Sequence, residues 1–329
     1  MDKFISIIIP NFNGSSTIGK CLEAALASPY SNFEVMVVDD CSTDESVRII
    51  EQFPCRLIRL DRHSGAAVAR NKGAENSNGE ILFFTDADCL IREDALSLAN
   101  KALADQRNDV IGGTYTPLPH DTDFFSTFQS IFIHYSETKK KEPDYIAGHA
   151  LVIEAALFKA SGGFPENPLP IPEDVKFSHQ LRRSGCRLIM VPEIQVSHVF
   201  NFTLFKSLRN AYRKSMFWTI YSLSNKDLLS DSGTASRELK ATIVCFFLNI
   251  LLAALSLILH DPMYLLPLPV VFICALFYSR KLLTSFFIAK GFFFFVRAAL
   301  YYAGVYPAAV GAGVFAGMVR YAVARRATE

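Results

Sequence analysis

The stretch EILFFTDAD (Glu80–Asp88) decides the fold, because a continuous apolar run ends in two carboxylates spaced two residues apart. An apolar run of this length is typical of a strand that is buried on both faces of a parallel sheet. In open α/β sheets, ligands bind at the carboxyl ends of such strands. The stretch therefore predicts a sheet and also the edge of that sheet where a site would lie.

Three apolar runs that precede this stretch are also predicted to be strands, and each is followed by a predicted helix. The strands are Phe4–Ile9, Phe33–Val38 and Cys55–Leu60, and the helices begin near Ser15–Thr17, Asp44 and Gly65. Repeated strand–helix units of this length imply a parallel sheet with right-handed crossovers. The predicted fold class is α/β, with a Rossmann-like, mostly parallel sheet and helices on both of its faces.

Polar residues follow three of the predicted strands. A single acidic strand end is usually a helix cap, but three polar strand ends at one edge favour a binding site. The residues are Asn11 and Asn13, Asp39 and Asp40, and Asp86 and Asp88.

Six motifs occur in order over about residues 4–200. They are IPNFN (Ile9–Asn13), VVDDCSTD (Val37–Asp44), Gly65 with ARN (Ala69–Asn71), TDAD (Thr85–Asp88), GGF (Gly162–Phe164) and Glu173–Asp174. In this order and spacing they resemble the family 2 glycosyltransferases, which are inverting nucleotide-sugar enzymes with the GT-A fold. The resemblance implies a GT-A catalytic domain over residues 1–200.

The resemblance assigns metal binding to the D-x-D pair. Asp86 and Asp88 would bind a divalent metal and the sugar nucleotide, and the hard cations Mn²⁺ and Mg²⁺ prefer oxygen ligands of this kind. Related enzymes can use a histidine near His198 as a further metal ligand. A histidine satisfied within the core explains His198 equally well.

The resemblance also implies a nucleotide pocket on the first strands. Asp39 would contact the nucleotide base, and a carboxylate can accept from a base N–H of uracil or guanine. The other residues predicted to bind the nucleotide sugar are Pro10, Asn11, Asn13, Asp40, Arg70 and Asp86. For Arg70, a surface ion pair on a helix is a close alternative.

Glu173 and Asp174 open a predicted helix, and the family places its general base at the second acid of such a pair. Asp174 is therefore the predicted base, which takes the proton of the acceptor hydroxyl. The positive end of a helix favours the ionised carboxylate that a base requires. Gly163 and Glu173 are predicted to lie on the acceptor side of the site.

The composition limits the class of protein. The 329 residues are 50% hydrophobic and 20% charged, which excludes a disordered chain. A formal net charge of +1 gives no support for nucleic-acid binding. Seven cysteines without a C-x-x-C pair argue against a disulfide framework and against structural zinc. The apolar run at the N-terminus is too short for a signal peptide, so the catalytic domain is expected in the cytoplasm.

Residues 241–329 are predicted to form a membrane domain. Apolar segments near 241–259 and 263–279 are each long enough to span a bilayer. Lys and Arg flank this pair only at its outer ends, so the positive-inside rule places both ends in the cytoplasm. A third apolar region, 286–319, is interrupted and followed by charges. It is either partly interfacial or a second hairpin that bends near Pro307, and the sequence leaves both open.

Residues 201–240 are predicted to form amphipathic linker helices. Phe205, Leu208, Tyr212 and Met216 share one face of a helix, beside a basic stripe that includes Arg209 and Arg213. Such a helix can lie at a membrane surface or pack on the domain. The adjacent spans favour the membrane, so Arg209 and Arg213 are predicted on the acceptor side. Later, Gly313 and Gly317 form a G-x-x-x-G pair that indicates either close helix contact or chance spacing.

The predicted function is a metal-assisted, inverting glycosyltransferase of the cytoplasmic membrane. It would move one sugar from a nucleotide diphosphate sugar to a lipid-linked or membrane-proximal acceptor hydroxyl. One alternative is a polyprenyl-phosphate sugar synthase, in which a phosphate is the acceptor. Another is a catalytically silent membrane scaffold, against which the intact Asp86, Asp88 and Asp174 argue.

Overall fold

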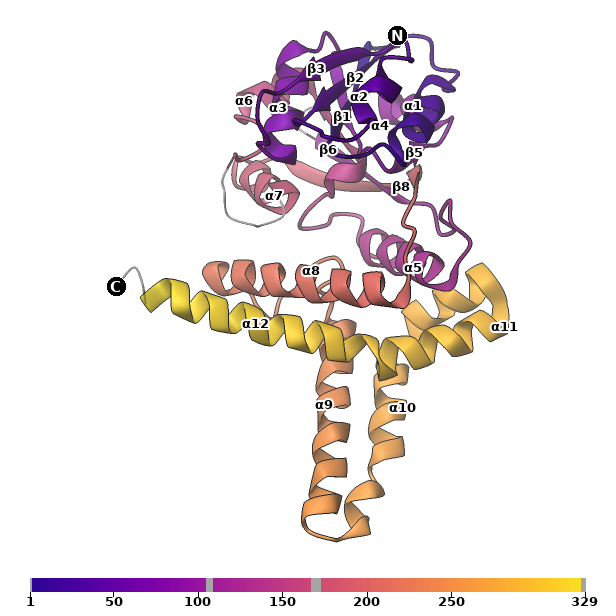
Figure 1. The fold of residues 1–329 in the computed structure, drawn as a ribbon, viewed down its shortest axis with the longest axis vertical. Coiled ribbons are helices and arrows are strands. Elements are labelled where there is room, and N and C mark those ends of the chain that lie inside the picture. Colours follow the sequence, from indigo (N-terminus) through magenta and orange to yellow (C-terminus); the bar gives the residue numbers. More distant parts are fainter. Residues whose placement is uncertain (1, 105–108, 167–172, 327–329) are drawn as a thin grey trace. The chain divides into compact units, whose positions relative to one another are not determined.

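The computed structural model describes residues 2–104, 109–166 and 173–326 (Figure 1). The chain divides into two compact units. Unit 1 comprises Met1–Thr122 and Glu137–Asn201, and unit 2 comprises Asp123–Ser136 and Phe202–Glu329.

Unit 1 is built on one eight-stranded sheet with the order β3-β2-β1-β4-β7-β6-β8-β5. The pairs β1–β2, β1–β4, β2–β3 and β6–β8 are parallel, and β4–β7, β6–β7 and β5–β8 are antiparallel. The predicted α/β class is therefore confirmed, with a sheet that is parallel in its first half and mixed in its second. The strands are β1 (Ile5–Asn11), β2 (Phe33–Asp39), β3 (Arg56–Arg59), β4 (Ile81–Phe84), β5 (Cys89–Ile91), β6 (Asp109–Tyr115), β7 (Leu151–Glu154) and β8 (Arg187–His198).

The four predicted N-terminal strands are present, and β1 runs two residues further than predicted. Asn11 lies inside β1, where it pairs in register with Asp39 of β2. Two of the predicted polar strand ends are therefore neighbours across a parallel pair. The helices of unit 1 are α1 (Ile18–Leu26), α2 (Ser46–Ile50), α3 (Ala66–Asn76), α4 (Ala95–Leu103), α6 (Ala155–Ala160) and α7 (Glu173–Arg183).

An aromatic cluster in the core of unit 1 fixes the position of α7. Phe164 lies edge-on to Phe84 of β4 at 5.1 Å between ring centroids, and it packs on Phe177 of α7 at 4.5 Å. All three side chains are buried. Since β4 leads into Asp86 and α7 begins at Glu173, this packing brings the two acidic motifs together.

Unit 2 is helical. Its helices are α5 (Phe124–Thr138), whose last two residues belong to unit 1, α8 (Leu204–Asn225), α9 (Arg237–Ile258), α10 (Leu268–Tyr278), α11 (Arg280–Gly304) and α12 (Tyr306–Arg326). A short 3₁₀ turn at Pro262–Leu265 joins α9 to α10. By length and composition alone, two helical segments of the described chain could cross a membrane, Arg237–Ile258 and the stretch Arg280–Arg326 that α11 and α12 form. Pro262–Tyr278 is a shorter apolar segment.

Helix α8 buries small side chains together with one member of its predicted apolar face, Met216. Phe205 is 73% exposed, whereas the small side chains of Ser207 and Ala211 are buried. Ser207 accepts a hydrogen bond from Tyr301 of α11, and α8 meets α12 further along, where a Cβ at Gly313 would come within 2.3 Å of the Tyr212 carbonyl oxygen. The G-x-x-x-G pair thus mediates close helix contact, because its glycines let the two backbones approach.

Candidate active site

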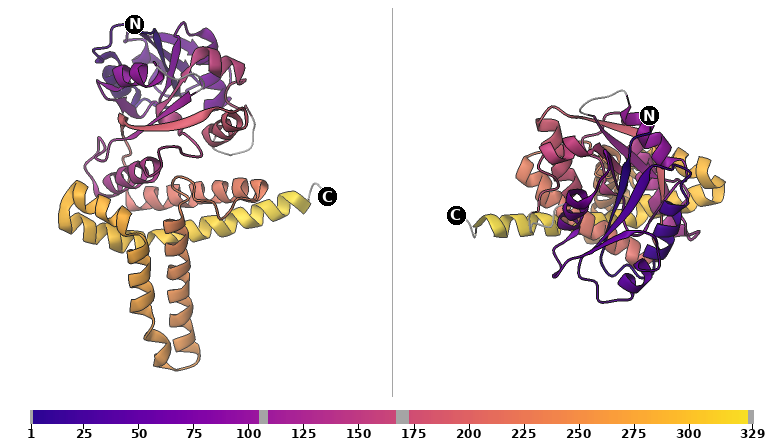
Figure 2. Two further views of the ribbon diagram at one scale, coloured as in Figure 1. Left: turned by 180° about the vertical axis from the view of Figure 1, so that it is seen from behind. Right: turned by 90° about the horizontal axis from the view of Figure 1, so that it is seen from above.

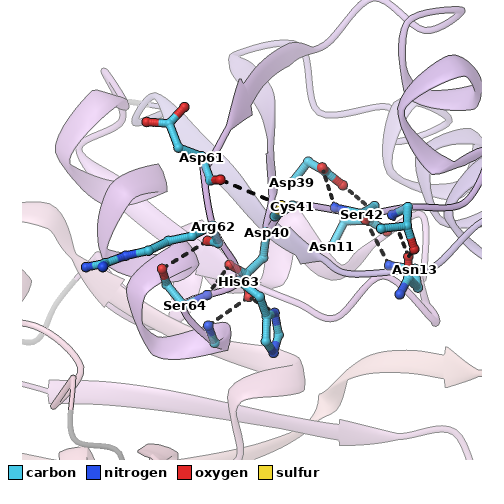
Figure 3. Close-up of polar contacts among 12 residues, drawn as sticks. Asn11, Asn13, Asp39, Asp40, Cys41, Ser42, Asp61, Arg62, His63 and Ser64 are labelled. Carbon is cyan, nitrogen blue, oxygen red and sulfur yellow. Dashed lines mark hydrogen bonds and ion pairs between the residues drawn. The ribbon is translucent and has the colours of Figure 1, made fainter.

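The first part of the site is a hydrogen-bonded turn at the ends of β1 and β2 (Figure 3). Asn11 Nδ2 donates to Asp39 Oδ1 over 2.8 Å, and the Ser42 N–H donates to Asp39 Oδ2 over 3.0 Å. The Asn13 N–H donates to Ser42 Oγ, and Asn13 Oδ1 in turn accepts from the Thr43 N–H. Both carboxylate oxygens of Asp39 are therefore held in place while lone pairs remain for a ligand N–H. Pro10 lies within β1, in register with Val38.

The neighbouring Asp40 organises the loop that leads into α3. Its two oxygens accept from the N–H groups of Ser64 and Gly65, each over 2.7 Å, and His63 Nδ1 lies 2.8 Å from Oδ2. The ring of His63 stacks on Phe12 with 4.0 Å between centroids. Gly65 has φ +93°, which an L-residue rarely adopts, so it allows this turn. Asp40 thus connects the loop to the strand edge that carries Asp39.

Arg70 joins two acids that are far apart in the sequence. Its Nη2 lies 2.6 Å from Asp86 Oδ1, and its Nη1 lies 2.5 Å from Glu173 Oε1. The Arg70 side chain is 5% exposed, so it is not a surface ion pair. Burial alone would raise the pKa of Asp86, but the guanidinium, together with His149 and His198, outweighs it and holds that pKa below its ordinary value.

Asp174 lies at the start of α7 and is held by two backbone groups. The Gly148 N–H donates to Asp174 Oδ2 over 3.1 Å, and the Val175 N–H donates to Oδ1 over 2.8 Å. Burial and then the charge of Glu173 raise the pKa of Asp174 to about 6, against the opposing effect of Arg70. The carboxylate is therefore mainly ionised at neutral pH, and it retains appreciable basicity.

Asp88, Cys89 and His198 form a second cluster, because His198 of β8 is in register with Cys89 of β5. Their ligand atoms all lie within 4.8 Å of one another, and His198 Nε2 is 3.4 Å from Asp88 Oδ2. Burial and the nearby Asp86 raise the pKa of Asp88 to about 7, although 42% of its side chain is exposed.

The residues of this cluster fit a divalent cation. The raised pKa of Asp88 means that its carboxylate is costly to ionise, and a bound cation would stabilise the ionised form. Carboxylate oxygens are also suitable ligands for Mg²⁺ and Mn²⁺. The Cys89 thiol fits less well, since burial and then Asp88 raise its pKa well above the ordinary value and keep it neutral. Asp88 and His198 are therefore the better donors, with Asp86 two residues away.

The GGF turn is shaped by Asn71 of α3. Asn71 Nδ2 donates to the Phe164 carbonyl over 2.8 Å, and Asn71 Oδ1 accepts from the Phe164 N–H over 2.9 Å. Gly163 has φ +74°, and a Cβ there would lie 2.7 Å from Asn71 Oδ1. The conformation and the space at this position both require glycine.

Sequence reasoning missed a buried polar group behind these acids. His149 Nε2 lies 3.4 Å from Glu137 Oε2, which also accepts from Thr114 Oγ1 over 2.7 Å. Tyr115 stacks on His149 at 4.0 Å and lies edge-on to His198. Burial would lower the pKa of His149, but the nearby acids Glu137, Asp86 and Asp174 together outweigh it and raise that pKa. The sequence signal was His149 itself, whereas its partners come from strands and helices that only the fold brings together.

The structure thus groups most of the predicted site residues in unit 1. One group lies at the ends of β1 and β2 and consists of Asn11, Asn13, Asp39 and Asp40. A second group is connected through Arg70 and consists of Arg70, Asp86 and Glu173, with Asp174 next to Glu173. Arg209 and Arg213 belong to α8 in unit 2, where both are exposed.

Comparison with known proteins identifies the domain. Residues 6–159 match the family described as Glycosyl transferase family 2. Glycosyltransferase AglE of Haloferax volcanii is 28% identical over 235 residues, which cover 67% of this chain and 76% of AglE. Glycosyltransferase GlyG of Streptococcus pneumoniae serotype 4 is 30% identical over 120 residues, 35% of this chain and 40% of GlyG.

The fold agrees with these matches. The mannosyltransferase PcManGT from Pyrobaculum calidifontis, solved in complex with GDP-Man and Mn²⁺, superposes with a TM-score of 0.60 at 20% identity. The alignment covers 97% of this chain and 88% of PcManGT. The expected GT-A-like fold is therefore confirmed. The chain carries a glycosyl transferase family 2 domain, and it is a glycosyltransferase.

Proposed function

We propose that the chain transfers one sugar from a nucleoside diphosphate sugar to an acceptor hydroxyl, with inversion at the anomeric carbon. One observation carries the proposal: the Arg70 guanidinium contacts both Asp86 and Glu173, at 2.6 and 2.5 Å. The buried guanidinium of Arg70 therefore pairs with one residue of the D-x-D motif and with the first residue of α7. Asp86, which would face the donor diphosphate through a bound metal, is thus linked to the start of α7, where Asp174 follows Glu173.

Asp174 is the proposed general base. In a single displacement, the acceptor oxygen forms a bond to the anomeric carbon as the bond to the diphosphate breaks, and Asp174 takes the hydroxyl proton. A pKa of about 6 supports this role, because the group is ionised at neutral pH and still binds a proton usefully. The backbone N–H groups of Gly148 and Val175 orient its carboxylate for this task.

Asp86, Asp88 and His198 are proposed to hold a divalent cation, Mn²⁺ or Mg²⁺. When bound, such a cation neutralises charge on the diphosphate leaving group. The presence of Mn²⁺ with GDP-Man in PcManGT supports the assignment. Arg70 keeps Asp86 ionised and fixed in place, which prepares this carboxylate for the donor.

The turn that Asn11, Asn13 and Asp39 form is the proposed seat of the nucleoside, together with Pro10 and Asp40. Asp39 is 1% exposed and is already fixed by two donors, so ligand binding would cost little further ordering. On the other side of the centre, Gly163 and Glu173 are proposed to border the acceptor.

The proposed acceptor is lipid-linked or a membrane lipid, and the proposed location is the cytoplasmic face of the cytoplasmic membrane. The apolar helix α9 supports membrane anchoring, since it is long enough to cross and only 11% of its most apolar window is buried. Arg209 and Arg213 of α8 are the proposed contacts to an anionic acceptor group.

A donor screen tests the function. Purified protein is incubated with native lipid extract, Mn²⁺ or Mg²⁺ and a panel of nucleotide sugars, while released nucleoside diphosphate and label in the lipid fraction are measured. We expect one donor to give both signals, with inverted product stereochemistry by NMR. Label only in water-soluble product would reject the lipid acceptor, and retained stereochemistry would reject the single displacement.

A further inference from the structure

Three helices of unit 2 carry charge of one sign. Helices α8, α11 and α12 contain eleven Lys and Arg residues and no Asp or Glu. The basic residues are Lys206, Arg209, Arg213, Lys214, Arg280, Lys281, Lys290, Arg297, Arg320, Arg325 and Arg326. A surface of this kind is complementary to anionic lipid headgroups.

The same helices expose large apolar side chains among those charges. Phe293 is 85% exposed and Phe315 is 70% exposed, and further exposed residues are Phe205, Phe287, Ile288, Phe292, Leu300 and Val323. Exposed apolar and basic side chains on one helix are typical of elements that lie in a membrane interface, where each type meets its preferred surroundings.

Helix α12 is long enough to span a bilayer, but its packing argues against it. A Cβ at Gly317 would lie 2.6 Å from the Met216 carbonyl oxygen, as Gly313 approaches that of Tyr212. The middle of α12 therefore lies against the part of α8 that contains Tyr212 and Met216, beside Arg209 and Arg213. If α12 crossed the membrane, these arginines would be carried into the hydrocarbon, where charged side chains are costly.

The arrangement within unit 2 agrees with this. Helices α8 and α12 lie side by side, and both run across the direction of the α9–α10 hairpin in each of the two side views (Figures 1 and 2). A hairpin that enters a membrane along its own axis would leave α8 and α12 roughly parallel to the membrane surface.

Helix α11 is broken at Gly291, which has φ +76°. The two parts, 280–290 and 292–304, are about 16 and 20 Å long at 1.5 Å per residue, which is short of the roughly 30 Å of bilayer hydrocarbon. Neither part spans alone, and Lys290 and Arg297 lie close to the break.

We infer that this protein meets the membrane in two modes, with α8, α11 and α12 lying in the headgroup layer of one leaflet that contains anionic lipid. Only the α9–α10 hairpin enters the hydrocarbon, and the apolar segment of its second arm, Pro262–Tyr278, contains no charged residue, unlike the two parts of α11. The inference rests on the membrane anchoring of the proposed function, and it assigns the 47-residue apolar segment Arg280–Arg326 to the interface instead of to a span.

Tryptophan quenching by depth tests the inference on the full chain, because Trp218 of α8 is its single tryptophan. The protein is reconstituted with lipids that carry a nitroxide either near the headgroup or near the end of the acyl chain. Three further reporters are made in a Trp218→Phe background: Phe293→Trp, Phe315→Trp and, on the hairpin, Leu251→Trp. Phe293, Phe315 and Leu251 are each more than half exposed, and Trp218→Phe keeps an aromatic ring at a partly buried position, so the variants should fold.

We expect the shallow nitroxide to quench Trp218 and the reporters at 293 and 315 about twofold more than the deep one, with the reverse at 251. Deep quenching at 315 equal to that at 251 would overturn the inference while leaving the anchoring intact. Shallow or absent quenching at 251 would instead overturn the anchoring itself. Neither result depends on sugar transfer.

A charge variant tests the lipid class. Shallow quenching of Trp218 should be stronger in phosphatidylcholine mixed with phosphatidylglycerol than in phosphatidylcholine alone, since each basic residue near an anionic surface adds attraction. The triple variant Arg209→Gln, Arg213→Gln, Lys214→Gln should lose most of this difference. The matched control, Arg48→Gln with Lys72→Gln in unit 1, should keep it. Equal quenching in both lipids for the parent chain would contradict the anionic surface.

Discussion

Arg70 Nη1 lies 2.5 Å from Glu173 Oε1, and this contact joins α3 to α7 across 103 residues of sequence. The same guanidinium reaches Asp86 through its other terminal nitrogen. Arg70 therefore links Asp86 and Glu173 directly, in addition to the aromatic packing that positions α7.

Replacing Arg70 by Met should destabilise the fold and abolish transfer. The change leaves Asp86 and Glu173 without their shared cation, and we expect a loss of about 2–3 kcal/mol in the free energy of unfolding, less than for fully buried partners. Those partners are 35% and 29% exposed, which is why solvent moderates the cost. Urea denaturation of the full chain in detergent measures it. Arg48→Met, whose surface pair with Glu45 is largely solvated, should change stability by less than about 0.5 kcal/mol.

Asp174→Asn should lower kcat about 10²- to 10⁴-fold, since the amide cannot take the acceptor proton. The Gly148 and Val175 N–H groups donate to different carboxylate oxygens, so the amide keeps one of these two hydrogen bonds while its NH₂ faces the other donor. We expect this to cost about 1–2 kcal/mol of stability and to leave the fold intact. Nucleotide affinity, measured by calorimetry, should stay unchanged because Asp174 does not belong to the Asp39 turn. Glu75→Gln on the surface of α3 is the matched control. A normal transfer rate in Asp174→Asn would remove the residue from the mechanism.

The transfer rate should fall as the pH drops through about 6, where Asp174 takes up a proton. The base must be ionised, so log kcat should rise with a slope near one below that pH and become level above it. The charged groups around it are Glu173, Arg70 and His149. Because this acid has a raised pKa, its ionisation also costs folding stability as the pH rises from about 4 to about 6. A rate that is constant across this range at saturating donor would contradict the assignment.

The sequence predicted the local elements of the site well, and it predicted long-range partners poorly. Apolar runs and their polar ends located β1, β2 and β4, because such signals lie within a few residues. The antiparallel entry of β7 between β4 and β6 was not predicted, and it is this pairing that brings Gly148 and His149 towards the acids. Partners such as Glu137 and Tyr115 depend on tertiary packing, for which periodicity carries no signal.

The α8 helix shows the same limit in unit 2. Its hydrophobic pattern marked the face of Phe205, Leu208 and Tyr212 as apolar without saying what covers it, and the structure buries Ser207 and Ala211 while Phe205 is exposed. Small residues give a weak hydrophobic signal, although close contact with the glycines of α12 requires them. Patterns therefore predict which face of a helix is apolar better than they predict which residues form close contacts between helices.

Removal of divalent metal should abolish transfer, and His198→Gln should raise the Mn²⁺ concentration for half-maximal rate about 10- to 100-fold. Enzyme treated with a chelator should regain its transfer activity when Mn²⁺ or Mg²⁺ is added. Cys89→Ala is the matched control within the same cluster, because the raised pKa of Cys89 keeps its thiol neutral and a poor ligand. If Cys89→Ala raised the Mn²⁺ concentration for half-maximal rate more than His198→Gln did, Cys89 and not His198 would be the metal ligand.

Gly163→Ala should destabilise unit 1 by about 2–4 kcal/mol, since an L-residue is strained at φ +74° and its Cβ meets Asn71 Oδ1 at 2.7 Å. Gly185→Ala separates the two causes. Gly185 also has a positive φ, of +86°, but a Cβ added there would have no atom within 4 Å, so strain of about 1–2 kcal/mol should act alone. Denaturant midpoints of the two variants give the difference. Equal losses would show that Asn71 moves aside without cost, and the Asn71 bonds to Phe164 would then not be what fixes the GGF turn.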